Sequence, residues 1–350
     1  MKFEPDFNNI VDAAWNRNPR RIPIYEHIIS VQKMEEYLQK PFAGLIDGDA
    51  GDKAEYFRLM CEFFLKLGYD TVSYECLISA ILPGNGALYS HKEGVIKDRK
   101  DFEDYPWDTV AETFFRNYED NFTALRTQLP PGMKVAGGPG NGFFECVQDI
   151  VGYTQLCYIK SDDPEVYAGL FERLGDVFTE IWTRFLAEFG DILAIGRFGD
   201  DLGFKSGMLL DPEDVRSLII PQYKRIIDLI HAAGKPFVLH SCGNIFEVMP
   251  DLIYTAGMNA KHSNEDVIAP FRVWVAEYGD IIGNFGGIDA DILCRKDSIT
   301  IEEYVKKVFN ETHNGKGVAY GSGNSIPDYM PLGGYLAMIE TIRELRGDYV

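Results

Sequence analysis

Short apolar runs recur along the chain and are separated by longer segments in which apolar residues repeat with helical spacing. The short runs are continuous and bounded by Gly, Pro or Asp, which is typical of strands that other layers cover on both faces. They predict eight strands, over residues 21–27, 70–76, 133–138, 192–198, 236–241, 258–263, 281–287 and 317–322.

Three of the longer segments carry clear helix signals, and they span residues 52–68, 163–190 and 211–234. In the second and third, Asp precedes a Pro at the first helical position and Gly follows the last turn, which are favourable start and stop residues. Pro221 lies inside the third segment. It predicts a kink there, because proline has no N–H to donate to the preceding turn.

Eight strands that alternate with helices favour an α/β fold of the (β/α)₈ barrel type over a doubly wound open sheet. No linker rich in Pro, Gly or Ser divides the chain, so we predict one domain over residues 1–350. Residues 81–108 form a long excursion after the second predicted strand, a position from which they can wall an active site.

Charge narrows the classes of partner. The chain has 34 Lys and Arg against 54 Asp and Glu, a formal net charge of −20 at pH 7. Such a field repels phosphate backbones and anionic lipid, so we expect neither nucleic acid nor a membrane surface as partner. The N-terminus lacks the apolar core of a signal peptide, and the six cysteines are dispersed. We therefore expect a cytoplasmic protein with reduced cysteines.

Polar side chains gather at the ends of the predicted strands, where a barrel places its catalytic groups. The candidate catalytic residues are Asp200, Asp201 and Glu75, and the Gly-Gly-Pro-Gly stretch at 137–140 is interpreted as a turn. The candidate substrate-binding residues are Glu26, His27, Tyr74, Arg197, Asp289, Ser322 and Asn324.

The paired aspartates allow two interpretations. Asp200 and Asp201 can orient a substrate amine or act as acid and base, if their environments separate their pKa values. Alternatively they form an acidic pair in a loop that accepts backbone N–H groups.

His240 and Cys242 stand two residues apart at the end of a predicted strand, so their side chains point the same way. Imidazole and thiolate together suit Zn²⁺, which needs about three protein ligands at a catalytic site. Glu265 is the candidate third ligand, with His262 as its competitor. The alternative is a buried cysteine beside a hydrogen-bonded histidine.

The order of motifs resembles the uroporphyrinogen decarboxylase superfamily over nearly the whole chain. The resemblance is carried by "RRIPIYEH", "GDDLGFKSGMLLDPEDVRSLIIPQYKRIIDLIHAAGKPFVLHSCGNI", "KHSNEDVI", "GNFGGID" and "YGSGNSIPDYMP". It implies a single barrel. The decarboxylase branch has an arginine-rich stretch after the first strand, whereas this chain presents Glu26 and no arginine there, and Ser322 replaces the histidine of the closing Gly-His-Gly motif.

The corrinoid-dependent methyltransferase branch fits better. It implies Zn²⁺ on His240 and Cys242, Glu265 as a matching carboxylate, and a last cysteine at the position of Ser322. Because that cysteine is absent, Cys294 is a candidate substitute.

The resemblance also implies a reaction. A methyl group would move between a corrinoid such as methylcobalamin, on a separate corrinoid protein, and a small acceptor. The acceptor would be a thiol or tetrahydrofolate, and Asp200 or Glu75 would bind the pterin ring of the latter. The alternatives are a decarboxylase of the uroporphyrinogen type and a non-catalytic barrel that binds a corrinoid or another ligand.

Overall fold

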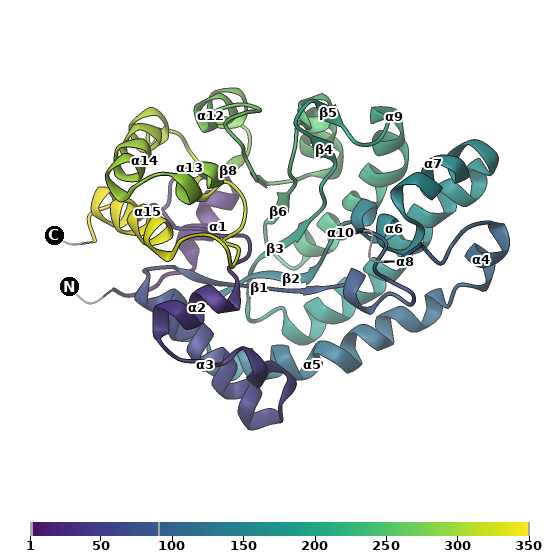
Figure 1. Cartoon of the computed structure of the whole chain (residues 1–350), viewed down its shortest axis with the longest axis horizontal. Helices are drawn as coiled ribbons and strands as arrows, with labels where there is room; N and C mark the ends of the chain where they lie inside the picture. Colours follow the sequence, from purple (N-terminus) through teal and green to yellow (C-terminus); the bar gives the residue numbers. More distant parts are fainter. Residues whose placement is uncertain (1–2, 90–91, 349–350) are drawn as a thin grey trace.

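A parallel sheet of seven strands forms the centre of the computed structural model, which describes residues 3–89 and 92–348. The sheet curls in the manner of a (β/α)₈ barrel, as the sequence predicts (Figure 1). Its strands, in spatial order, are β1 (Thr71–Leu77), β2 (Lys134–Gly140), β3 (Leu193–Gly199), β6 (Phe237–His240), β7 (Ala260–His262), β8 (Gly283–Ile288) and β9 (Val318–Ser322). A separate antiparallel hairpin joins β4 (Gly203–Phe204) to β5 (Gly207–Met208).

The first predicted strand, residues 21–27, does not form a ladder, and this corrects the expected count of eight. It makes one parallel bridge to β9, between Ile24 and Tyr320. On the β1 side, the hydroxyl of Ser73 contacts the carbonyl oxygens of Glu26 and His27 at 2.8 and 2.5 Å. The Ser73 hydroxyl thus takes the place of the backbone N–H donors of a regular ladder. Residues 21–27 therefore lie between β9 and β1, at the eighth position of the barrel, without regular strand pairing.

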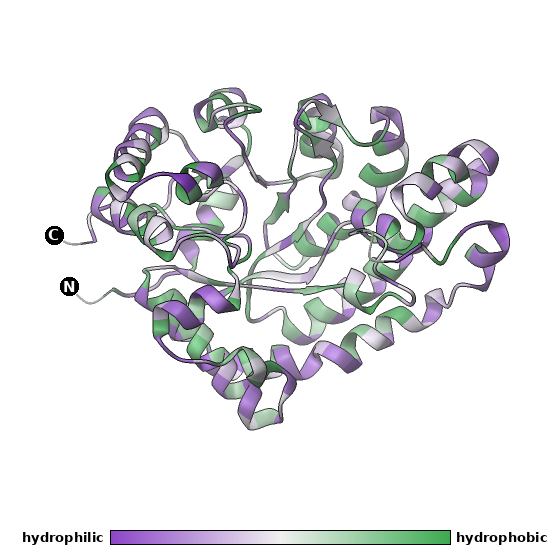
Figure 2. Cartoon of the chain, in the orientation of Figure 1, coloured by the Kyte–Doolittle hydropathy of each residue, from purple (hydrophilic) through white to green (hydrophobic). Residues whose placement is uncertain are grey.

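Helices surround the sheet (Figure 1) and turn apolar stripes inward (Figure 2). They are α1 (Asn8–Ala14), α2 (Val31–Leu38), α3 (Ala50–Lys66), α4 (Arg99–Asp104), α5 (Val110–Gln128), α6 (Phe143–Val151), α7 (Tyr153–Asp162), α8 (Pro164–Phe189), α9 (Pro212–Asp214), α10 (Ile220–Ala232), α11 (Met249–Asp251), α12 (Phe271–Tyr278), α13 (Ala290–Arg295), α14 (Ser298–Thr312) and α15 (Leu332–Leu345). Single 3₁₀ turns lie at Ala43–Asp47, Ser79–Ile81, Trp107–Thr109 and Phe246–Val248.

The predicted helix signals are present. The side chain of Asp163 accepts a hydrogen bond from Val166 N at the start of α8, and Asp211 caps α9. The third predicted helix is interrupted, since a π-helical turn over Val215–Ile219 separates α9 from α10. This wide turn ends two residues before Pro221, so the irregularity expected at the proline takes the form of a π-bulge.

Alternation along the strands separates an apolar floor from a polar mouth inside the barrel. A small buried cluster inside the sheet includes Ile195, Val238 and Ala260, and α1 packs Ile10 against it. Two residues further along β6, His240 follows Val238, and His262 follows Ala260 on β7 in the same way. Because side chains repeat with a period of two, these polar groups lie above the floor, at the carboxyl ends of the strands.

Two loop predictions have different outcomes. Residues 137–140 are not a turn but the second half of β2, paired with β1 from Tyr74 to Leu77. Their glycines allow this close packing, because a Cβ on Gly137 would lie 1.8 Å from the carbonyl oxygen of Tyr74. Residues 81–108 do follow a strand as a long excursion, in which α4 is the main helix of the described residues.

Candidate active site

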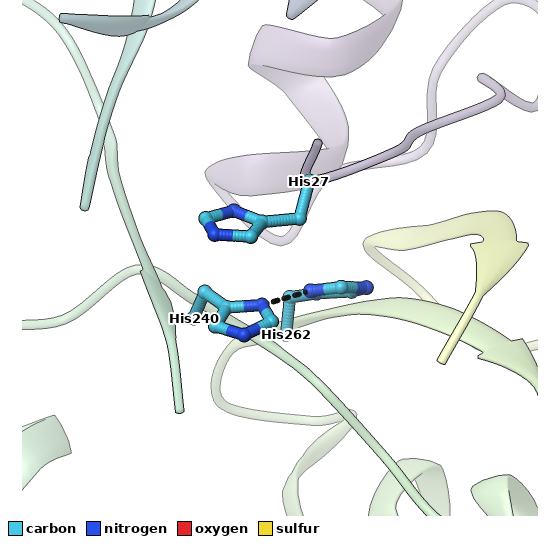
Figure 3. A group of neighbouring side chains, drawn as sticks. All are labelled: His27, His240 and His262. Atoms are coloured by element: carbon cyan, nitrogen blue, oxygen red, sulfur yellow. Dashed lines mark hydrogen bonds between the residues drawn. The ribbon is translucent and has the colours of Figure 1, made fainter. Parts of the chain in front are cut away.

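Three histidines from segments far apart in the sequence meet at the mouth of the barrel (Figure 3). His240 ends β6, His262 ends β7, and the two are direct partners in the sheet register. His27 leaves the first segment and lies over His240, with ring centroids 3.7 Å apart and planes 10° from parallel. All three are buried.

Hydrogen bonds define the tautomers of two of these rings. His262 Nε2 lies 2.9 Å from the carbonyl oxygen of Ser322, which can only accept, so Nε2 carries the proton. His262 Nδ1 must then accept from His240 Nδ1, 2.7 Å away. Nε2 of His240 is consequently left with a free lone pair. Burial lowers the pKa of His240 well below its usual range, as does the proximity of His262 and Arg197, so the ring is neutral.

That lone pair faces Cys242 and Asp201. His240 Nε2 lies 3.4 Å from Cys242 Sγ and 3.9 Å from Asp201 Oδ1. Asp201 also accepts the backbone N–H of Cys242 at 2.8 Å, which ties the two loops together. Burial raises the pKa of the Cys242 thiol, and the charge of Asp201 raises it further. Asp201 itself remains 42% exposed, so this trio opens to solvent on the carboxylate side.

Two groups of possible metal ligands share His240 among the described residues: His27, His240 and His262, and Asp201, His240 and Cys242. The three histidines fit a metal poorly. Nδ1 of His240 and Nδ1 of His262 already bond to each other. The stacked rings of His27 and His240 hold their nitrogen lone pairs in nearly parallel planes, so these lone pairs do not meet at one point. The second group fits Zn²⁺ well, because sulfur and nitrogen on a tetrahedral zinc lie about 3.5 Å apart. Its thiolate and carboxylate would balance the charge of the ion.

The sequence predicts Glu265 as the third ligand, with His262 as its competitor. Glu265 belongs to neither group among the residues that the structure describes, and its carbonyl oxygen accepts from Ile268 and Ala269 in a local turn. Cys294 lies on α13 and is likewise outside both groups. The carboxylate that lies with His240 and Cys242 in a possible ligand group is that of Asp201.

Ser322 does not turn its side chain toward Cys242. Its backbone N–H donates to Glu26 Oε1 at 2.9 Å, and its hydroxyl forms a short contact with the other oxygen of Glu26. The same hydroxyl lies 3.1 Å from the carbonyl oxygen of Asn324. The Ser322 hydroxyl is thus the donor toward both Glu26 and the carbonyl oxygen of Asn324. Burial raises the pKa of Glu26 to about 8, although the hydrogen bonds from Ser322 lower it.

Arg197 and Glu75 form an ion pair inside the barrel. Arg197 Nε donates to Glu75 at 3.0 Å, and both side chains are almost completely buried. Arg197 Nη1 donates to Ser73 at 2.6 Å. These contacts engage Glu75 and the Nε and Nη1 atoms of Arg197, whereas Arg197 Nη2 is buried without a hydrogen-bond partner among the described residues. We infer that the ion pair supports the barrel wall.

Asp200 also serves the fold. Its carboxylate accepts the backbone N–H groups of Phe144 and Glu145 at the start of α6, and the hydroxyl of Tyr223 at 2.6 Å. Burial raises the pKa of Asp200 to about 6 in spite of these bonds. Both aspartates therefore accept backbone N–H groups, as one of the two interpretations expects, but only Asp201 is also near His240 Nε2 and partly exposed.

Glu145 has no place among the sequence candidates, yet it lies beside Asp200 and Asp201. It accepts from Asn141 Nδ2 at 2.8 Å and from the backbone N–H of Asp201 at 3.3 Å. Burial, together with the two aspartates, raises its pKa well above the usual range. One sequence signal for Glu145 is its position in the first turn of a helix that follows the glycine-rich end of a strand, where functional groups often gather.

The other candidates divide between the site and its surroundings. Asn324 Nδ2 donates to Cys242 Sγ at 3.4 Å, as Ser263 Oγ does at 3.5 Å, so the sulfur has two donors. Tyr74 points outward and packs its ring against Phe57. Asp289 caps α13 by accepting from two backbone N–H groups there.

A comparison with protein-family models identifies the family of this chain. The model of the family described as uroporphyrinogen decarboxylase (URO-D) matches residues 90–345. The chain belongs to the uroporphyrinogen decarboxylase family. The match covers every strand of the barrel sheet after β1, including the ends that carry Asp201, His240 and Cys242. A comparison with curated protein sequences gave no match.

Solved structures with a similar fold include a methyltransferase and a putative methionine synthase. A methyltransferase from Methanosarcina mazei superposes with a TM-score of 0.70 at 14% identity, covering 98% of this chain and 99% of its own. A putative vitamin-B12 independent methionine synthase from Listeria monocytogenes gives a TM-score of 0.51 at 12% identity, covering 95% and 99%. At these identities, the similarity to both structures concerns the fold alone. It agrees with the barrel predicted from the sequence of this uroporphyrinogen decarboxylase family member.

Among the described residues, no helix is both long enough and apolar enough to cross a bilayer.

Proposed function

We propose that this protein is a methyltransferase that moves a methyl group between a corrinoid, carried by a separate corrinoid protein, and a small thiol. The observation that carries the proposal is the convergence of Cys242 Sγ, His240 Nε2 and the Asp201 carboxylate at the barrel mouth. These three groups make a zinc site with one side open to solvent, as a catalytic zinc requires.

Zinc bound there would supply a Lewis acid that lowers the pKa of a coordinated thiol, so that the substrate reacts as thiolate. The protein contributes the rest. His240 presents a neutral lone pair because His262 fixes its tautomer. Asp201 lies on the exposed side, where a substrate enters. Asn324 and Ser263 donate to Cys242 Sγ and hold the sulfur in place.

We favour a thiol acceptor over tetrahydrofolate because the two carboxylates expected to bind a pterin ring already have partners within the protein. Glu75 is paired with Arg197, and Asp200 is bonded to the start of α6, so neither is free to bind a pterin ring. A pterin would instead have to use Glu145 and Asn141, which lie next to Asp201. Tetrahydrofolate is thus the second acceptor to test.

The test begins with metal content. Protein purified without a histidine tag should contain about one zinc per chain, and the Cys242→Ala variant should contain almost none. The wild type is then incubated with methylcobalamin and either a thiol or tetrahydrofolate, and loss of the methyl group is followed by the colour of the cobalamin.

Three results would contradict the proposal in different ways. Demethylation by tetrahydrofolate alone, in protein without zinc, would replace the thiol by a pterin. Conversion of uroporphyrinogen to coproporphyrinogen without any demethylation would identify a decarboxylase. Binding of cobalamin with neither reaction would identify a non-catalytic barrel.

A further inference from the structure

The ring of His27 covers one face of His240 (Figure 3). The ring centroids are 3.7 Å apart, and the planes are within 10° of parallel. The centroid of the His27 ring lies 6.0 Å from that of His262, at 33° to it, so the ring stacked directly on His27 is that of His240. Such an arrangement restricts rotation of the imidazole of His240 about its side-chain bonds.

The orientation of its ring separates His27 from the proposed ligands, although its Nδ1 is buried and has no hydrogen-bond partner among the described residues. Because the two rings are parallel, their nitrogen lone pairs do not converge on one ion. The ring of His27 therefore contacts His240 through its face, not through a polar atom.

The stacked pair has space because β3 ends in a glycine. A Cβ on Gly199 would lie 3.3 Å from both His240 Cδ2 and His27 Nε2, closer than ordinary contact. Gly199 is also the sheet partner of His240. Its backbone does not have a positive φ, so the absence of a side chain, rather than backbone freedom, is what this position provides.

We propose that His27 is a positioning residue that fixes the ring plane of His240 by stacking, so that Nε2 is aimed at the ion shared with Asp201 and Cys242. This inference rests on the proposed zinc site. His262 sets the tautomer and in-plane rotation of His240 through a hydrogen bond, while His27 prevents the ring from tilting. The two histidines thus restrain different degrees of freedom of one ligand.

The test compares two substitutions of similar volume. His27→Phe keeps a flat ring over His240, whereas His27→Leu fills the space without one. Zinc affinity of each full-length protein is measured by competition with a chromophoric chelator, and ligand geometry is followed in the absorption spectrum of the Co²⁺-loaded protein. Thermal unfolding of the metal-free proteins verifies that each is folded. If the Leu variant does not fold, His27→Asn removes the ring with a polar side chain.

We expect the Phe variant to bind zinc within about threefold of wild type and to keep the cobalt spectrum, while the Leu variant loses about 10–100-fold in affinity and shows an altered spectrum. Equal affinity in all three proteins would overturn the inference. Complete loss of zinc in both variants would also overturn it, because His27 would then be a ligand. Wild-type protein that binds no zinc would contradict the proposed function itself, and the inference with it.

Discussion

Ser322 holds the carboxyl group of Glu26 through its backbone N–H and its hydroxyl, although the two residues are 296 positions apart in the chain. This pair joins the first segment of the barrel to its last strand, β9. Burial of Glu26 in this pair favours its protonated form, which has a measurable consequence for stability.

Replacing Glu26 by Gln should make stability less dependent on pH. Burial raises the pKa of Glu26 from 4.5 to about 8. The folded protein therefore retains a proton that the unfolded chain loses, and wild-type stability falls as pH rises between these two values. The Gln amide keeps the same donor and acceptor without titrating. The free energy of unfolding of Glu26→Gln, measured with urea, should therefore rise relative to that of wild type by about 2–4 kcal/mol between pH 5 and pH 8.5. Parallel pH profiles of the two proteins would contradict this.

Asp201, and not Glu265, should control zinc affinity. Asp201→Asn keeps an oxygen that can accept the backbone N–H of Cys242, but it removes the charge, so zinc binding should weaken by at least about 100-fold. Glu265→Gln is the matched control and should bind zinc as wild type does. Chelator competition at pH 7 measures both. A comparable loss in the Glu265 variant would restore the ligand expected from sequence.

Breaking the buried ion pair should cost much more than breaking an exposed one. Glu75→Gln leaves the guanidinium of Arg197 buried without its anion, and we expect a loss of about 3–5 kcal/mol in the free energy of unfolding. Glu93→Gln, which disrupts the exposed pair with Lys97, should have a negligible effect. Urea unfolding at pH 7 compares them. Similar stabilities for the two variants would show that the buried pair is dispensable.

The irregular closure of the barrel should be sensitive to one methyl group. A Cβ on Gly321 would lie 1.8 Å from the carbonyl oxygen of Tyr25, which belongs to the first segment. Gly321→Ala should therefore destabilise the protein by about 1–3 kcal/mol or more. Gly207→Ala is the control, because a Cβ at 207 has no atom within 4 Å. Thermal unfolding of both variants checks the prediction, and equal transition temperatures would refute it.

Sequence patterns predicted the barrel because its strands are short, apolar and separated by well-capped helices. They also placed His240 and Cys242 on one side of a strand, since alternation in an extended chain is local. The prediction of a regular strand over residues 21–27 was wrong. The apolar run of this segment is typical of a strand, yet the neighbour on one side is the side chain of Ser73, and that contact depends on the closed barrel.

The third member of the proposed zinc site could not be found from spacing alone. Asp201 reaches His240 because its loop follows β3, the sheet neighbour of β6, and crosses toward Cys242. Glu265 follows β7, an equally near strand, so order in the sequence does not distinguish them. Glu145 was missed for a related reason, because it belongs to a helix and not to a strand end.

The loops of Asp201 and Cys242 are also joined behind these side chains. Asn244 N donates to the carbonyl oxygen of Phe204 at 2.8 Å, and a Cβ on Gly243 would lie 2.1 Å from the carbonyl carbon of Gly203. Gly243 has a φ of +83°, which glycine adopts without strain. The two backbones are therefore in contact without any ion between them. Capture of a metal would require little loss of chain entropy, and its release would leave the surrounding loops folded and ready to bind again.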